Sequence, residues 1–201
     1  MDLHAALHAD RCALLALIAK LSFRLGDFTL ASGAKSDYYI DCRVTTLDAE
    51  GGRLSGLLFA ELIRQHAPEA VAVGGLTMGA DPLVSNTASA SAWWHLLHPE
   101  VRVLDGFLVR KAAKLHGTGR QIEGFVRPGA KVVIVDDVCT TGGSTLQAIQ
   151  AMKAAEMQVE AVLCLVDREQ GGREAIQAAI GEKPFVPAFT ATELKQFVTL
   201  H

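Results

Sequence analysis

The feature that most constrains the fold is a run of four β-branched apolar residues, Val132 to Val135, directly after Lys131. Such a run predicts a strand that is buried on both faces, as in the interior of a parallel sheet. Further short strands are predicted at residues 70–73, 106–109, 161–166 and 185–189, and helices at residues 49–66, 82–97, 143–156 and 172–180. Strands that alternate with helices predict an α/β fold with a mostly parallel central sheet flanked by helices.

The start of the chain does not follow this alternation. Two short strands are predicted at residues 28–30 and 38–40, and a helix before them, because apolar residues recur at helical spacing. The helical face carries Leu3, Leu7, Leu14, Ile18 and Leu21. We expect about residues 1–45 to form a small N-terminal cap, or hood, beside the sheet. With 201 residues and no linker-like stretch, the chain (residues 1–201) is predicted to be a single domain.

Composition excludes several classes of protein. Half of the residues are hydrophobic, and 19 Lys+Arg against 22 Asp+Glu leave a net charge of −3, so no global basic field indicates a nucleic-acid partner. No apolar stretch is long enough to cross a membrane, and the acidic start argues against a signal peptide. The four cysteines form no CxxC pair. These features predict a cytoplasmic protein with no membrane association.

The most informative segment continues from the run of valines. Two adjacent carboxylates, Asp136 and Asp137, come first, and a turn rich in threonine and glycine then opens a helix. Backbone N–H groups at a helix N-terminus bind phosphate, whereas paired carboxylates suit a ribose diol or the water shell of Mg²⁺. Helix capping explains one hydroxyl but not this whole pattern. The turn consists of Val138, Cys139, Thr140, Thr141, Gly142, Gly143 and Ser144.

A basic segment at residues 110–120 is the second candidate for phosphate binding. It gathers Arg110, Lys111, Lys114 and His116, together with two glycines, in a chain that is acidic overall. It follows a predicted strand at the sheet edge where ligands bind in α/β proteins. Such a loop can close over a diphosphate and neutralise developing charge. The alternative is a solvated basic surface loop.

These two segments resemble known motifs. Residues 136–144 resemble the phosphoribosyl diphosphate (PRPP) signature of type I phosphoribosyltransferases, in which the acids hold the ribose hydroxyls and the loop holds the 5′-phosphate. Residues 110–119 are similar to the mobile catalytic loop of orotate phosphoribosyltransferases, RKxxKxHGxG, which reaches into the neighbouring site of a homodimer. The resemblance implies the type I phosphoribosyltransferase fold, a homodimer whose 110–120 loop acts on the neighbouring subunit, and catalytic roles for Lys114, His116, Asp136 and Asp137. The PRPP-binding residues that it implies are Arg110, Lys111, Lys114, His116, Asp136, Asp137 and the turn 138–144.

Two further segments resemble the orotate enzymes. Residues 28–41 look like their motif FTLxSGxxSxYY/F, whose paired aromatic residues form part of the wall over the pyrimidine. Arg168 matches the arginine that contacts orotate, and a guanidinium fork suits a carboxylate. The resemblance thus implies that Tyr38, Tyr39, Thr140 and Arg168 bind orotate. From the residues alone, at least one of the tyrosines is predicted in the core, and Arg168 has the alternative of pairing with an adjacent acid.

The chain departs from the resemblance at two positions. Met78 lies in the segment 74–82, the place of the diphosphate-binding loop, where many members have a lysine and a cis non-proline peptide bond. Ala31 likewise stands where many members have a second lysine. We expect backbone amides of residues 77–80 to bind the diphosphate instead, with help from the neighbouring subunit's 110–120 loop.

The resemblance implies one reaction: PRPP and orotate give orotidine 5′-monophosphate and diphosphate, in de novo pyrimidine (UMP) biosynthesis. The implied cofactor is Mg²⁺, carried by PRPP near Asp136 and Asp137, and no residue is assigned as a direct metal ligand. Two alternatives stay open: a phosphoribosyltransferase for another base, and a non-catalytic PRPP-sensing regulator. A regulator that binds RNA or DNA would need a basic face, of which the net charge of −3 gives no sign.

Overall fold

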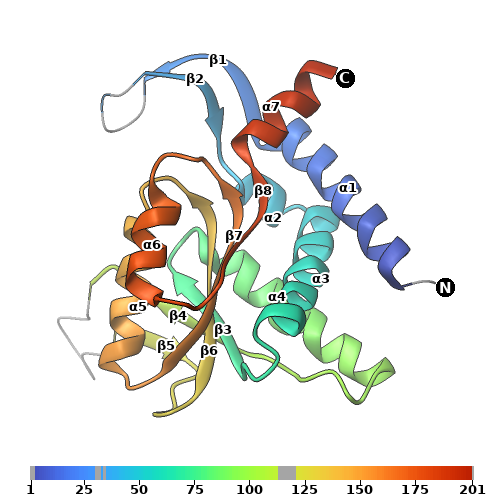
Figure 1. Cartoon of the computed structure of the whole chain (residues 1–201). Coiled ribbons are helices and arrows are strands. Elements are labelled where there is room, and N and C mark those ends of the chain that lie inside the picture. The colour runs from blue at the N-terminus through green and yellow to red at the C-terminus, as the bar shows by residue number, and fades with distance from the viewer. Residues whose placement is uncertain (1–2, 30–32, 34, 113–120, 201) are drawn as a thin grey trace.

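The predicted alternation of strands and helices is confirmed in the computed structural model, which describes residues 3–29, 33, 35–112 and 121–200 (Figure 1). The central sheet has the strand order β5-β4-β3-β6-β7-β8. Neighbouring strands are parallel except for β4 and β5, which are antiparallel. The strands are β3 (Ala72–Leu76), β4 (Asp105–Val109), β5 (Ile122–Gly124), β6 (Lys131–Cys139), β7 (Gln158–Asp167) and β8 (Phe185–Thr190).

Helices cover both faces of this sheet. Successive side chains of β6 point to opposite faces, so they pack against different helices. Val133 and Val135 belong to the core on the side of α3 (Ala49–His66) and α4 (Ala80–Leu97). Val132 and Ile134 belong to the core on the side of α5 (Gly143–Ala154) and α6 (Gly172–Ile180). Burial on both faces explains why this strand begins with an unbroken apolar run, and it confirms the predicted α/β class.

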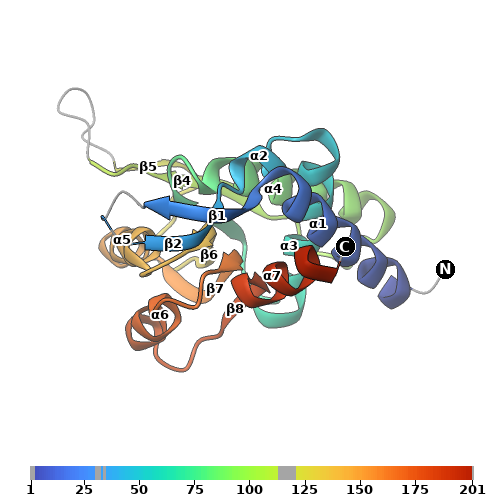
Figure 2. The same ribbon diagram turned by 90° about the horizontal axis from the view of Figure 1, so that it is seen from above.

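The N-terminal segment forms the helix and hairpin of the predicted hood. They are α1 (Leu3–Leu21), β1 (Phe23–Thr29) and β2 (Lys35–Ile40), and the short helix α2 (Arg43–Thr46) follows them. The hairpin is antiparallel and lies across the sheet when the molecule is seen from above (Figure 2). The ring of Phe23 stacks on that of Tyr38, with centroids 5.2 Å apart. The Tyr38 hydroxyl accepts a hydrogen bond from Arg168, just beyond β7, so the hood lies over the carboxyl ends of the parallel strands.

A C-terminal helix that the sequence analysis did not predict, α7 (Ala191–Leu200), packs beside α1 (Figure 1). Arg11 of α1 donates to Glu193 of α7 at 2.9 Å, and Lys195 of α7 donates to Asp37 of β2 at 2.7 Å. The hairpin is therefore tied to the last helix of the chain as well as to the sheet.

Strands β1, β5 and β6 differ most from the prediction. Strand β1 begins at Phe23, five residues before the predicted start at residue 28. The strand predicted at residues 131–135 continues to Cys139, because β7 is long enough to pair with it as far as Asp167. The two carboxylates therefore belong to the strand instead of following it. Strand β5 was not predicted, since its three residues are too short for a periodic pattern. Within the described part of the chain, no helix combines the length and apolar character needed to span a membrane.

Candidate functional site

A cavity of about 680 Å³ lies at the carboxyl edge of the sheet, beneath the hood. It brings together parts of β2, α2, β3 and β6, the residues after β3 and β4, and the start of α5. Its lining residues are Tyr39, Ile40, Asp41, Arg43, Leu76, Thr77, Met78, Gly79, Arg110, Lys111, Ala112, Asp136, Asp137, Val138 and Ser144. The cavity is thus lined by residues of the segments 74–82, 110–120 and 136–144 that the sequence singled out, and by Tyr39 of the hood.

Asp136 is the more deeply buried of the two carboxylates, with 6% of its surface exposed. Burial raises the pKa of Asp136 to about 7, and a hydrogen bond from Thr145 opposes this rise. The Thr145 hydroxyl donates to Asp136 Oδ2 at 2.7 Å. Sequence reasoning missed Thr145, although its place in the first turn of the helix after the loop was a usable signal. The contact holds the carboxylate in one orientation.

Asp137 is half-buried and lies against the segment that follows β3. Burial raises the pKa of Asp137 as well, while its hydrogen bonds to backbone N–H groups and the nearby Arg43 act in the opposite direction. A Cβ atom at Gly79 would collide with Asp137 Oδ1, so only glycine allows this approach. The Thr77–Met78 peptide bond is cis, as the resemblance implied.

The threonine and glycine loop connects β6 to α5. Gly142 adopts a left-handed conformation with φ of 79° immediately before the first helical residue, Gly143. Ser144 lines the cavity and Thr141 is exposed, whereas Cys139 is fully buried with its carbonyl oxygen bonded to the backbone N–H of Arg168. The first N–H groups of α5 have no partners within the helix, which makes this turn suitable for a phosphate group.

The described part of the basic segment begins at the cavity. Arg110 and Lys111 both line it, and Arg110 Nε donates to Glu123 Oε1 of β5 at 3.0 Å. The carbonyl oxygen of Lys111 accepts a hydrogen bond from Gln147 of α5 at 2.6 Å. Lys114 and His116 lie outside the described residues, as does Ala31.

Arg168 bonds to the hood instead of to its neighbouring acids. Its Nε donates to the Tyr38 hydroxyl at 3.0 Å, and its Nη2 donates to Ser36 Oγ at 3.3 Å. Asp167, the alternative partner, pairs with Arg173 at 3.4 Å. Tyr38 is buried, which confirms that one of the paired tyrosines belongs to the core, while Tyr39 is 44% exposed and lines the cavity.

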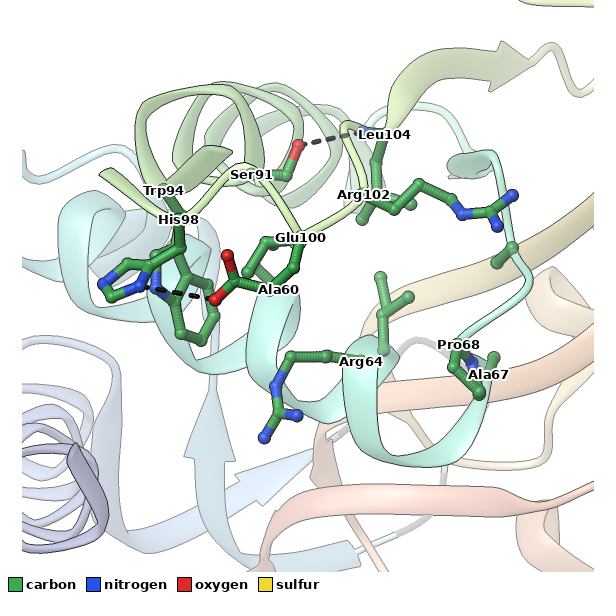
Figure 3. Close-up of a pocket in the computed structure, with 13 residues that line it drawn as sticks. Ala60, Arg64, Ala67, Pro68, Ser91, Trp94, His98, Glu100, Arg102 and Leu104 are labelled. Carbon is green, nitrogen blue, oxygen red and sulfur yellow. Dashed lines mark hydrogen bonds and ion pairs between the residues drawn. The ribbon is translucent and has the colours of Figure 1, made fainter. Parts of the chain in front are cut away.

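A second cavity, of about 340 Å³, lies at the opposite edge of the sheet, between the C-terminal ends of α3 and α4 (Figure 3). Two contacts join polar groups that line it: Ser91 Oγ accepts from the backbone N–H of Leu104 at 3.0 Å, and His98 pairs with Glu100 at 3.5 Å. Because ligands of α/β sheets bind beyond the carboxyl ends of the strands, the cavity beneath the hood is the candidate functional site.

Comparison with known proteins agrees with this geometry. The family described as "Phosphoribosyl transferase domain" matches residues 57–181. The chain is 43% identical to the orotate phosphoribosyltransferase of Rhodopirellula baltica over 170 residues, which cover 83% of this chain and 85% of the relative. It is 40% identical to that of Aquifex aeolicus over 192 residues, which cover 94% of this chain and 98% of the relative.

Solved structures give the same result. The orotate phosphoribosyltransferase of Mycobacterium tuberculosis in complex with Fe(III) dicitrate superposes with a TM-score of 0.78 at 37% identity, covering 92% of this chain and 98% of that one. A structure of the M. tuberculosis enzyme in complex with PRPP superposes with a TM-score of 0.72 at 31% identity, covering 92% of each chain. With this identity over this much of its length, the chain belongs to the orotate phosphoribosyltransferase family.

Proposed function

We propose that this protein transfers the phosphoribosyl group of PRPP to orotate, releasing diphosphate and forming orotidine 5′-monophosphate for pyrimidine biosynthesis. The observation that carries the proposal is the single cavity lined by Asp136, Asp137 and the start of α5, with Arg168 held under the hood at the same edge of the sheet. A sugar phosphate and a carboxylated base can meet there.

The PRPP side of the cavity follows from the carboxylates and the loop. The N–H groups at the start of α5 suit the 5′-phosphate, and the carboxylates of Asp136 and Asp137 suit the two ribose hydroxyls. Thr145 orients the Asp136 carboxylate, and contact with Gly79 fixes the position of Asp137. The ribose is then held on one face, which leaves its C1 atom open to the base.

We assign the base from Arg168, which lies at the same edge of the sheet as the cavity but is not among its lining residues. Its guanidinium is buried and its orientation is set by Tyr38 and Ser36. A fixed guanidinium favours a planar carboxylate, which orotate has and uracil lacks. The exposed ring of Tyr39 adds an aromatic wall on the cavity. Recognition of the carboxylate is therefore the basis on which we assign orotate as the substrate.

We propose Mg²⁺ as the cofactor, carried into the site by PRPP. Among the described residues there is no group of three or more His, Cys, Asp or Glu side chains that could hold a metal ion by itself. Carboxylate oxygens are nevertheless the ligands that Mg²⁺ prefers, and Asp136 and Asp137 line the cavity. When bound, Mg²⁺ offsets the negative charge of the diphosphate.

We also propose a cytoplasmic homodimer in which the 110–120 loop, whose first residues line the cavity of their own chain, acts on the neighbouring site. An apolar surface on α4 supports this assembly, because Trp93, Leu96 and Leu97 are each at least 70% exposed. These residues lie at the C-terminal end of α4, whereas the cavity lies beyond its N-terminal end, beside Gly79. Lys114 and His116 are then proposed to act across the dimer interface.

The test is the ultraviolet absorbance change of orotate with purified protein, PRPP and Mg²⁺, run beside uracil, adenine and xanthine. Of the four bases, we expect only orotate to be consumed, and only when PRPP and Mg²⁺ are both present. Turnover of another base would make this a different phosphoribosyltransferase. Binding of PRPP without turnover of any base would favour a regulator.

A further inference from the structure

The cavity is lined by a cationic side chain, Arg43, that no sequence motif indicated. Arg43 is the first residue of α2 and lines the cavity together with Met78, Gly79 and Asp137. No motif pointed to it, because its place in the cavity depends on how the chain turns after β2. Its side chain is 45% exposed, so the guanidinium is accessible from the cavity.

A neighbouring carboxylate holds this guanidinium in place. Arg43 Nε donates to Asp41 Oδ1 at 2.8 Å, and Arg43 Nη2 donates to Asp41 Oδ2 at 2.7 Å. The backbone N–H of Arg43 also donates to Asp41 Oδ1, at 3.1 Å. This two-point contact occupies one edge of the guanidinium and leaves the N–H groups of its other edge for a ligand. The cation is thus oriented before any substrate binds.

The neighbours of Arg43 indicate which part of the substrate it meets. Arg43 is close enough to Asp137 to act against the burial that raises the pKa of that carboxyl group. Asp137 in turn touches Gly79, within the segment after β3. Met78 contributes no charge to this wall. The other cations that line the cavity, Arg110 and Lys111, follow β4, and Arg110 is paired with Glu123 as Arg43 is with Asp41. Arg43 is therefore the guanidinium that lines the cavity from α2, with one edge still free for a ligand.

We propose that Arg43 binds the diphosphate group of PRPP and stabilises it as it leaves. When the bond between C1 and the diphosphate oxygen breaks, its electron pair stays with the diphosphate. C1 forms its new bond to N1 of orotate, and the proton of N1 is lost to water. The charge that accumulates on the diphosphate then lies beside a guanidinium held in position by Asp41. This inference rests on the proposed function.

The experiment compares Arg43→Gln and Arg43→Lys with a matched control, Arg53→Gln. Arg53 is paired with Glu50 through the same two-point contact, at 2.8 and 2.6 Å, and its side chain is 48% exposed, but it does not line the site cavity. For Arg43→Gln we expect the KM for PRPP and the Ki for diphosphate to rise about tenfold or more, with the KM for orotate within about twofold of wild type. Arg43→Lys should be intermediate, and Arg53→Gln should match wild type.

A second substitution tests whether the effect of Arg43→Gln comes from the loss of positive charge. Met78 is 65% exposed at the cavity, so Met78→Lys places a cation on the same wall. In the Arg43→Gln background this second change should restore much of the affinity for PRPP. Calorimetric titration with Mg²⁺ and diphosphate gives the same comparison without turnover, and melting temperatures show whether each variant is folded.

The outcomes separate the two proposals. A wild-type protein that does not turn over orotate contradicts the proposed function, whatever Arg43 does. If the wild type is active and Arg43→Gln leaves the KM for PRPP and the Ki for diphosphate unchanged, the proposed role of Arg43 is wrong. Equal losses in Arg43→Gln and Arg53→Gln would also overturn it, since they would indicate a general effect of removing a surface ion pair.

Discussion

The carboxylate of Asp136 illustrates how one residue sets the chemistry of this site. Burial favours its neutral form and raises its pKa to about 7, while the hydrogen bond from Thr145 favours the charged form. The ionised carboxylate accepts hydrogen bonds on both oxygens, whereas the protonated group has an O–H on one oxygen that must itself donate. We therefore expect the affinity of the free enzyme for PRPP to change near neutral pH as the Asp136–Asp137 pair ionises.

Removing the Thr145 hydroxyl should move this titration. In Thr145→Val the pKa of Asp136 loses an interaction that lowers it, so the acid limb of kcat/KM for PRPP shifts to higher pH, and activity at pH 6 falls more than at pH 9. A pH profile of kcat/KM measures this, and Thr145→Ser, which keeps the donor, should shift less.

Thr87→Val is the matched control for that profile. Thr87 is also buried, but its hydroxyl has no hydrogen-bond partner in the part of the chain that the structure describes. Its profile should coincide with that of wild type. An acid limb that stays in place in Thr145→Val would contradict the role assigned to Thr145.

At the scale of elements, the β1–β2 hairpin connects the base-recognising arginine to the hood. Tyr38 of β2 stacks on Phe23 and accepts a hydrogen bond from Arg168, and Lys195 of α7 lies 4.7 Å from the centre of its ring. The orientation of Arg168 thus depends on how the hairpin packs, although Arg168 itself follows a strand of the central sheet.

Tyr38→Phe tests this connection, because it removes the hydroxyl and leaves the stacked ring. We expect the KM for orotate to rise about threefold to tenfold with little change in the KM for PRPP, since one hydrogen bond to a charged group is lost. Steady-state kinetics with each substrate varied in turn measure the two constants. Lys195→Gln, which loosens the tie between α7 and the hairpin, should have a smaller effect on the KM for orotate. An equal rise in both constants for Tyr38→Phe would indicate a general disturbance of the site.

Most of the strands could be predicted from the sequence, whereas contacts between separate elements could not. Strands β3, β6 and β7 were predicted because largely buried strands are continuous apolar runs, and the partly exposed β4 and β8 were predicted from shorter runs of apolar residues. The phosphate loop was predicted because its residue types serve one chemistry. Asp136 and Asp137 were placed after the strand, since local pattern does not show that β7 continues beside them. Arg43 could not be found in this way, because its role depends on contacts between separate elements. Thr145 was missed although its place in the first turn of α5 was a usable signal.

At the scale of the whole molecule, the proposal of shared active sites makes a prediction for mixed dimers. Lys114→Ala removes the loop lysine, and Arg168→Ala removes the base-recognising arginine, so each variant alone should be nearly inactive. If the loop acts on the neighbouring subunit, a hybrid dimer contains one intact site, and an equal mixture should regain about one quarter of wild-type activity. Activity of a refolded mixture measures this.

The same mixture can contradict the assembly. Activity that remains at the average of the two parent variants, in a sample shown by mass measurement to contain hybrid dimers, would mean that each loop serves its own subunit. A protein that is monomeric under assay conditions would contradict the assembly directly. In that case the exposed apolar residues of α4 would have another role.

Phosphorus NMR of PRPP and orotate with the purified protein tests the reaction itself. We expect the PRPP signals to be replaced by those of free diphosphate and one nucleoside monophosphate, in equal amounts, only when orotate and Mg²⁺ are present. The variant Asp136→Asn/Asp137→Asn should show almost no conversion. Consumption of PRPP at the same rate without orotate, or an unchanged rate in the double variant, would contradict the claim that this cavity is a phosphoribosyltransferase active site.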